Sequence, residues 1–232
     1  MQSHMKEYRK NELKYYVIGN ILILLLIHGM FDGLMTRVSN DAVDIIETLL
    51  GSAIIGSIVY IYTFLLDSFM PSKAKDAIAY FPTGRPGDYI FTKIEQRDSD
   101  ARFMKEQVQK KYSDVYKEIY RLQANGKKKE LSKYQNSEWY KIYKDNQDDE
   151  SVYTSQQDFL LIRDMESMTI MIAAFYIVMV VLKVISFDGR ALAFVIVEFL
   201  LSNLAAKSKA KRFTYNVIAT DLNPRTAKEK SK

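Results

Sequence analysis

Cysteine is absent from the chain, and histidine occurs only twice. The lack of cysteine excludes disulfides, thiolate nucleophiles and cysteine-based zinc or iron–sulfur sites. One histidine, His4, belongs to residues 1–4, which resemble the remnant of a cloning tag, so we expect the natural chain to start at Met5. The other, His28, would have to serve any serine hydrolase triad, yet it lies inside an apolar run. Classical hydrolase and zinc chemistry are therefore not expected.

Glycine-rich phosphate loops are also missing. The chain has no GxxxxGK[ST] motif and no GxGxxG motif that follows a strand. These absences predict a protein that is not an enzyme and that holds no cofactor and no metal ion. One enzymatic alternative stays open, an enzyme acting on lipid-linked substrates in the membrane. It would need three carboxylates to converge, those of Asp98, Asp100 and Asp164.

Long apolar runs are what the sequence has instead. A helix needs about 20 apolar residues to cross a bilayer. Four segments approach that length, namely 16–35, 45–66, 168–187 and 191–206. Helices of a soluble core average about 11–12 residues and usually have a polar face, which these segments lack. The pattern predicts an all-α integral membrane protein with two transmembrane hairpins, 16–66 and 168–206.

Basic residues gather beside the apolar segments. Residues 1–15 have four basic and two acidic residues, and residues 207–232 have eight and two, whereas the central region, 67–167, has 18 of each sign. Because cytosolic flanks are rich in lysine and arginine, we place both termini and the central region in the cytosol. The basic tails then lie against the anionic lipid bilayer, so the net charge of +5 does not indicate nucleic acid as a partner.

The central region, 67–167, predicts a small, mainly helical cytosolic domain. Residues 89–94 favour a short strand or extended segment. Ser99 or Asp100 can cap a helix that ends at Asn125-Gly126, and a further helix carries Trp139. A last helix runs from about residue 152 toward the third apolar segment. If that helix continues into the segment without a break, it couples the domain to the membrane.

Four polar residues interrupt the apolar segments. Asn20 and His28 lie a little over two helical turns apart, which suits hydrogen bonds between helices. Lys183 and Glu198 carry charges that are rare inside a membrane. Either they pair with each other within their hairpin, or the Lys183 side chain extends outward to the membrane surface. Alternatively, Glu198 lines a pore or a subunit interface once several copies assemble.

Small residues recur at four-residue spacing in the second apolar segment. Such faces allow helices to approach closely, within one chain or between chains. They are consistent with a homo-oligomer. The residues concerned are Ser52, Ala53, Gly56 and Ser57.

Basic and aromatic residues of the central region form a candidate ligand site. Arginine and lysine can pair with phosphate groups, and aromatic rings can stack on bases, so a nucleotide-like ligand is one option. Ordinary salt bridges to the equally numerous acidic residues are the alternative. The candidates are Arg85, Lys93, Arg102, Trp139, Tyr140 and Arg163.

Several short motifs, in order, resemble those of a family of small bacterial four-span membrane proteins that has no assigned activity. They are Pro86-Gly87 with Phe91, DSDAR at 98–102, NSEWYKIY at 136–143, LLIRD at 160–164 and RFTYNVIA at 212–219. By architecture the chain is also similar to membrane effectors of bacterial antiphage signalling. That similarity implies a cytosolic sensor that drives assembly of transmembrane helices and a breach of the membrane.

The function expected from the sequence is therefore an oligomeric inner-membrane effector. Its cytosolic domain would sense a signal or a protein partner, and its transmembrane helices would permeabilise or depolarise the membrane. The alternative is a non-enzymatic scaffold or accessory subunit that recruits a cytosolic partner.

Overall fold

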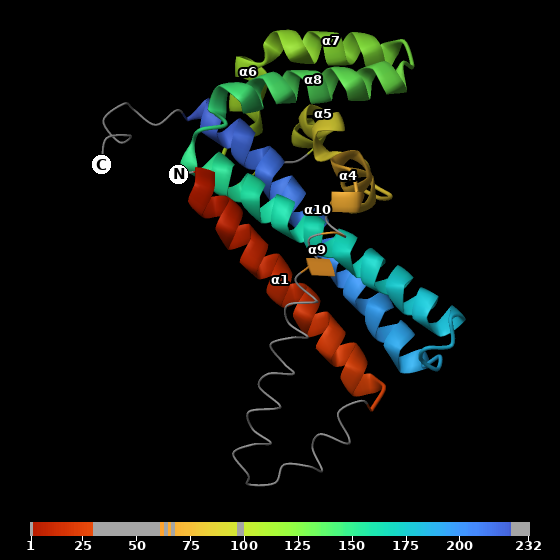
Figure 1. The fold of residues 1–232 in the computed structure, drawn as a ribbon. Helices are drawn as coiled ribbons and strands as arrows, with labels where there is room; N and C mark the ends of the chain where they lie inside the picture. The colour runs from red at the N-terminus through yellow and green to blue at the C-terminus, as the bar shows by residue number, and fades with distance from the viewer. Residues whose placement is uncertain (1, 30–60, 63–64, 66–67, 97–99, 224–232) are drawn as a thin grey trace. The chain divides into compact units, whose positions relative to one another are not determined.

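The computed structural model describes residues 2–29, 61–62, 65, 68–96 and 100–223 (Figure 1). Within these ranges the regular structure is helical and includes no strand, as the all-α prediction requires. Two helices there, α9 (Glu150–Val181) and α10 (Gly189–Leu222), are long and apolar enough to cross a membrane. The second predicted membrane segment, 45–66, lies almost entirely outside the described residues, so the four-span arrangement stays a prediction.

The chain divides into two compact units. Unit 1 comprises Met1–Ala79 and Leu161–Ala206, and unit 2 comprises Tyr80–Leu160 and Lys207–Lys232. α9 and α10 each contribute to both units, so the predicted continuation of a helix into the third apolar segment is confirmed. The region after residue 207 differs from the expected basic tail. It is helical to Leu222, because α10 continues and its apolar residues pack into unit 2.

Unit 1 contains α1 (Gln2–Ile27) and α4 (Ser72–Ala79) together with the parts of α9 and α10 named above. α1 packs against α9, since Leu13 and Val17 form a buried cluster with Met168 and Ile172. Leu13 and Val17 are four residues apart and therefore lie on one face of their helix. At the end of α1, the guanidinium of Arg190 donates to the carbonyl of Ile27 at 3.1 Å.

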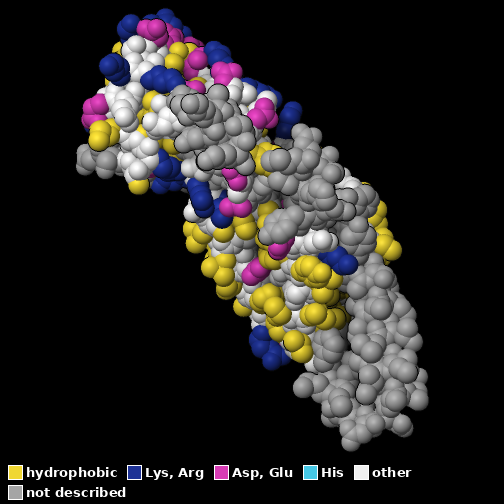
Figure 2. All heavy atoms as spheres, turned by 90° about the vertical axis from the view of Figure 1, so that its left-hand side faces the viewer, with side chains coloured by type: hydrophobic (Ala, Val, Ile, Leu, Met, Phe, Trp, Pro, Cys, Tyr) yellow, Lys and Arg dark blue, Asp and Glu magenta, His cyan; other side chains and the backbone are white. Residues whose placement is uncertain are grey.

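Much of the apolar surface of unit 1 is exposed. Figure 2 shows hydrophobic side chains gathered over the surface of the long helices. A water-soluble protein rarely leaves such a large apolar patch uncovered. The most exposed apolar side chains of this kind on α9 and α10 are Phe175, Ile177, Val178, Val181, Ile196, Val197, Leu200, Leu201 and Leu204.

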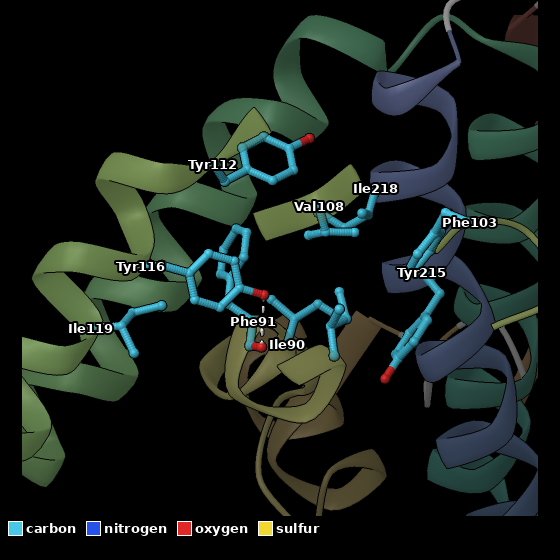
Figure 3. Close-up of a cluster of buried hydrophobic side chains, with 10 residues drawn as sticks. Ile90, Phe91, Phe103, Val108, Tyr112, Tyr116, Ile119, Tyr215 and Ile218 are labelled. Carbon is cyan, nitrogen blue, oxygen red and sulfur yellow. Dashed lines mark hydrogen bonds between the residues drawn. The ribbon is translucent and has the colours of Figure 1, made fainter. Parts of the chain in front are cut away.

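Besides its parts of α9 and α10, unit 2 contains five described helical elements. They are η1 (Pro86–Asp88), α5 (Ile90–Glu95), α6 (Lys105–Lys111), α7 (Ser113–Ala124) and α8 (Lys128–Asn146). The side chain of Phe91 lies in its core, edge-on to the rings of Tyr112 and Tyr116 (Figure 3). The Tyr116 hydroxyl also donates to the carbonyl of Phe91 at 3.1 Å. Tyr215 and Ile218 of α10 complete this core.

The predicted strand at 89–94 is wrong, because residues 90–95 form the helix α5. Ile90, Phe91 and Ile94 are all buried. Their spacing of one and four residues fits one face of a helix, whereas a strand would bury alternate residues. Tertiary packing against the core overrides the strand preference of β-branched and aromatic residues. A buried Gln135 on α8 holds the helix, since its Oε1 accepts from the backbone N–H of Thr92 at 3.1 Å.

The helix expected after Asp100 begins later and is divided into α6 and α7. Asp100 instead holds a turn, since its carboxylate accepts from the backbone N–H of Arg102 at 3.1 Å. The predicted end at Asn125-Gly126 is confirmed. Gly126 has a φ of 67°, and the N–H of Lys127 reaches back to the carbonyl of Leu122 at 3.1 Å, as in a Schellman cap.

Gly87 marks a close approach between η1 and α8. A Cβ atom at this position would lie 2.5 Å from Oδ1 of Asn136 and 3.2 Å from Cε3 of Trp139. The indole has little freedom to move. It stacks on Tyr143, and its N–H donates to the carbonyl of Thr214 at 3.2 Å. The Pro86-Gly87 and NSEWYKIY motifs thus meet in one packing contact.

We expect Gly87→Ala to lower the free energy of unfolding by about 1–3 kcal/mol, because the added methyl group overpacks the contact with α8. Trp139 is the sole tryptophan, so its fluorescence in a denaturant titration follows unit 2 directly. Met104→Ala is the control, since Met104 is also in unit 2 but is 65% exposed. An unchanged midpoint for Gly87→Ala would contradict the prediction.

Asp221, near the end of α10, ties three helices together. Its carboxylate pairs with Lys111 of α6 at 2.8 Å and accepts from Asn146 of α8 at 3.0 Å. The hydroxyl of Tyr112 also donates to it. Burial by itself would raise the pKa of Asp221, but the hydrogen bonds from Lys111, Tyr112 and Asn146 outweigh burial and hold the pKa below its usual value.

Acid is therefore expected to weaken unit 2 through Asp221. A carboxyl group with a lowered folded-state pKa stabilises the fold above its unfolded pKa of about 3.9, and this stabilisation is lost as the pH falls through the folded value. Asp221→Asn should cost about 1–2 kcal/mol at pH 7 and show less loss on acidification than the wild type. Trp139 fluorescence titrations at pH 7 and below pH 4 measure both effects. Parallel pH profiles for the two proteins would contradict this assignment.

Candidate functional site

The strongest polar feature of unit 1 is a buried cluster on α9, just before the residues predicted to enter the membrane. Arg163, Asp164 and Glu166 have exposed fractions of 8%, 1% and 0%. They fall within one helical turn, in and beside the LLIRD motif. Charged side chains are almost never this deeply buried unless they are paired, so their partners define the site.

Arg163 links two acidic residues. Its Nη1 lies 2.8 Å from Oδ1 of Asp76 on α4. Its Nε and Nη2 donate to Oδ1 of Asp164 at 3.1 and 3.0 Å. Lys75, also on α4 and buried, has its Nζ 3.7 Å from the same oxygen of Asp164. The guanidinium of Arg163 therefore connects α4 to α9 through charge-assisted hydrogen bonds.

Asn203 brings α10 into the same cluster. Its Nδ2 donates to Oε1 of Glu166 at 2.7 Å and to the backbone carbonyl of Ile78 on α4 at 3.4 Å. The buried polar cluster, as we call it below, thus joins three helices of unit 1. It consists of Lys75, Asp76, Arg163, Asp164, Glu166 and Asn203.

The chemistry open to the buried polar cluster is electrostatic. It has two cationic and three acidic side chains but no histidine, cysteine or hydroxyl nucleophile. Among the residues that the structure describes, no three acidic or histidine side chains come together as a metal site. A cluster of this type can fix the register of the helices that it joins, because its charged groups must meet their partners.

The carboxylates of the enzymatic alternative are not assembled in one unit. Asp164 belongs to the buried polar cluster of unit 1. Asp100 belongs to unit 2 and forms an ion pair with Arg102 at 2.8 Å. Asp98 lies outside the described residues.

The predicted intramembrane residues occupy different environments. Asn20 is buried on α1 and donates to the carbonyl of Tyr16 at 2.9 Å, within its own helix. His28 lies just past the end of α1, with its ring 5.7 Å from that of Tyr176 on α9. The four small residues of the second apolar segment, at 52, 53, 56 and 57, lie outside the described residues.

Lys183 and Glu198 do not pair in the part of the chain that the structure describes. α9 ends at Val181, so Lys183 falls in the following turn, where it is exposed and has a φ of 58°. Glu198 is half-buried on α10, beside the hydroxyl of Tyr16 on α1. The predicted span 168–187 therefore stops being helical before its charged residue.

Two of the ligand candidates serve the packing of unit 2. Arg102 forms a fork with Asp100, donates to Oδ1 of Asn216 at 2.8 Å and lies over the ring of Tyr215. Trp139 packs edge-on against Phe213. Residues of the DSDAR, NSEWYKIY and RFTYNVIA motifs thus contact one another within unit 2. These contacts are the salt bridges and packing given above as the alternative to a ligand site.

The other candidates are dispersed. Arg85 and Lys93 are exposed in unit 2, and Tyr140 is exposed with Lys144 over its ring at 5.5 Å. Arg163 belongs to unit 1, so the six candidates do not assemble in one unit. Sequence reasoning missed Lys75, Asp76, Glu166 and Asn203. Glu166 alone had a signal in the sequence, as a charged residue directly before the apolar segment 168–187.

No protein-family model, curated protein or solved structure matches this chain, so the resemblance to a bacterial membrane-protein family stays a prediction from its motifs.

Proposed function

We propose that this protein is a homo-oligomeric effector of the bacterial inner membrane. Unit 2 is its cytosolic domain and responds to a signal or a protein partner. Its apolar helices then permeabilise or depolarise the membrane, as in antiphage defence. Both termini are cytosolic in this proposal. Basic residues are concentrated in the two terminal regions that flank the apolar segments, and cytosolic flanks are rich in lysine and arginine.

The observation that carries the proposal is the exposed apolar surface of α9 and α10. In α10, Val197, Leu200, Leu201 and Leu204 are each more than half exposed. Each such side chain gains about 1.5–3 kcal/mol when it leaves water, which a bilayer allows. Both helices also continue into unit 2, so a change of packing there has a direct route to the apolar helices.

We expect Val178→Asp to prevent stable insertion of α9 in the membrane. Val178 is 51% exposed near the middle of the predicted third span. An aspartate at the centre of a membrane helix costs about 3 kcal/mol. Resistance of the protein to alkaline extraction from membranes measures insertion. Val178→Leu is the control and should stay in the membrane, while equal retention of both variants would contradict a lipid-facing position.

Depolarisation is tested directly in bacterial cells that express the full chain at graded levels with a potential-sensitive dye. The proposal expects a loss of membrane potential that rises steeply with expression, because several copies must assemble. The Val178→Asp variant controls for the burden of expression. A membrane potential that is undisturbed at every level would overturn the effector function.

The scaffold is the second candidate, and one observation favours it. Arg102 and Trp139, the best residues for a nucleotide-like ligand, already make internal contacts. A protein partner that binds the outer face of unit 2 needs neither residue to be free. Mass measurement in detergent separates the two functions, since the effector is expected to be oligomeric and the scaffold monomeric.

A further inference from the structure

α4 is a helix that depends on its neighbours. It has eight residues, and isolated helices shorter than about 12–15 residues are marginal in water. Its buried residues are Lys75 and Ala79, so apolar burial contributes little to holding it. Docking of α4 must therefore rest largely on polar contacts.

Those polar contacts are the ones that α4 makes in the buried polar cluster. Asp76 pairs with Arg163 at 2.8 Å, and Lys75 lies 3.7 Å from Asp164, both on α9. The carbonyl of Ile78 accepts from Asn203 of α10 at 3.4 Å. α4 is thus held to the two helices that are long and apolar enough to cross a membrane.

The contact between Asp76 and Arg163 can open at modest cost. Arg163 has a second partner, Asp164, on its own helix, so it does not become an isolated buried charge when Asp76 leaves. The side chain of Asp76 is already 28% exposed and returns easily to water.

The position of α4 in the chain gives its release a consequence. It stands between the predicted membrane segment 45–66 and Tyr80, the first residue of unit 2. We propose that α4 is a releasable latch, in which the ion pair between Asp76 and Arg163 keeps this connection docked on α9 and α10. When the pair opens, α4 unfolds and the membrane helices are free to rearrange. The last step rests on the proposed function, whereas the latch itself does not.

Thiol labelling of the full chain in membranes tests the latch. Because the chain has no cysteine, Ala79→Cys introduces a single thiol at a position that is 0% exposed. We expect Asp76→Asn to raise the rate at which a water-soluble maleimide labels this thiol by about tenfold or more, since a charge-assisted hydrogen bond is lost. Asp76→Glu, which keeps the charge, should restore most of the protection.

Lys73→Cys is the matched control, because Lys73 is exposed on the same helix. Its thiol should be labelled at the same rate with Asp76 and with Asp76→Asn. Asn203→Ala removes a separate contact of α4 and should also raise labelling of the buried thiol. Trp139 fluorescence verifies that unit 2 stays folded. A labelling rate that Asp76→Asn leaves unchanged would overturn the latch, whatever Asn203→Ala does.

The membrane potential, measured on the same variants, separates the latch from the effector function. Faster labelling with an unchanged potential supports the latch and counts against permeabilisation. Faster labelling with a greater loss of potential supports both. Loss of potential with a labelling rate independent of Asp76 supports permeabilisation and overturns the latch.

Discussion

Replacing Arg163 by alanine is expected to destabilise unit 1 by about 3 kcal/mol, because a buried ion-pair network loses its central cation and only Lys75, at 3.7 Å, is left beside the Asp164 carboxylate. Asp164, which is 1% exposed, would lose the two hydrogen bonds that the guanidinium donates. Asp76 would lose its contact across helices at the same time. The free energy of unfolding, measured in mixed micelles by far-ultraviolet circular dichroism, should show this loss.

Arg121→Ala is the matched control, because Arg121 pairs with Glu118 on the surface of α7 and is 67% exposed. Surface ion pairs contribute about 0–1 kcal/mol, so this variant should be close to the wild type. Arg163→Lys should fall between the two, since it keeps the charge but loses the planar fork. A loss of less than about 1 kcal/mol for Arg163→Ala would show that the pairing is not what stabilises α9 here.

Replacing Phe91 by alanine is expected to destabilise unit 2 by about 3–5 kcal/mol, through lost burial and the cavity that remains. Phe91 is 0% exposed, and its ring packs edge-on against those of Tyr112 and Tyr116, with centroid distances of 5.6 and 6.0 Å (Figure 3). Denaturant titration followed by Trp139 fluorescence measures the effect, because Trp139 packs against this core.

Met104→Ala is the control for Phe91→Ala. Met104 is also in unit 2 but is 65% exposed, so its truncation should change the unfolding free energy by less than about 0.5 kcal/mol. Phe91→Leu should lose less than Phe91→Ala, since it fills most of the cavity. If Phe91→Ala and Met104→Ala had similar midpoints, the short helix α5 could not belong to a cooperative core.

The candidate site was only partly accessible from the sequence. Arg163 was predicted as a ligand candidate and as part of the LLIRD motif, but its partners are 87 residues away in Asp76 and 1 residue away in Asp164. Nothing in the spacing of α4 indicates which of its two neighbours, Lys75 or Asp76, meets which charge. Arg102 is the opposite case. The sequence singled it out as a ligand candidate, but in the structure its guanidinium donates hydrogen bonds to Asp100 and Asn216.

The apolar run lengths and the periodicity by themselves predicted the all-α class, and two of the four predicted segments lie in helices that are long and apolar enough to span a membrane. Such features depend on neighbours within one or two turns, which the sequence contains directly. Tertiary structure alone decided that residues 90–95 are helical, that the region after residue 207 completes the core of unit 2, and that α4 docks through buried charges. Each of these depends on partners far along the chain, because burial and pairing are set by three-dimensional packing and not by local spacing.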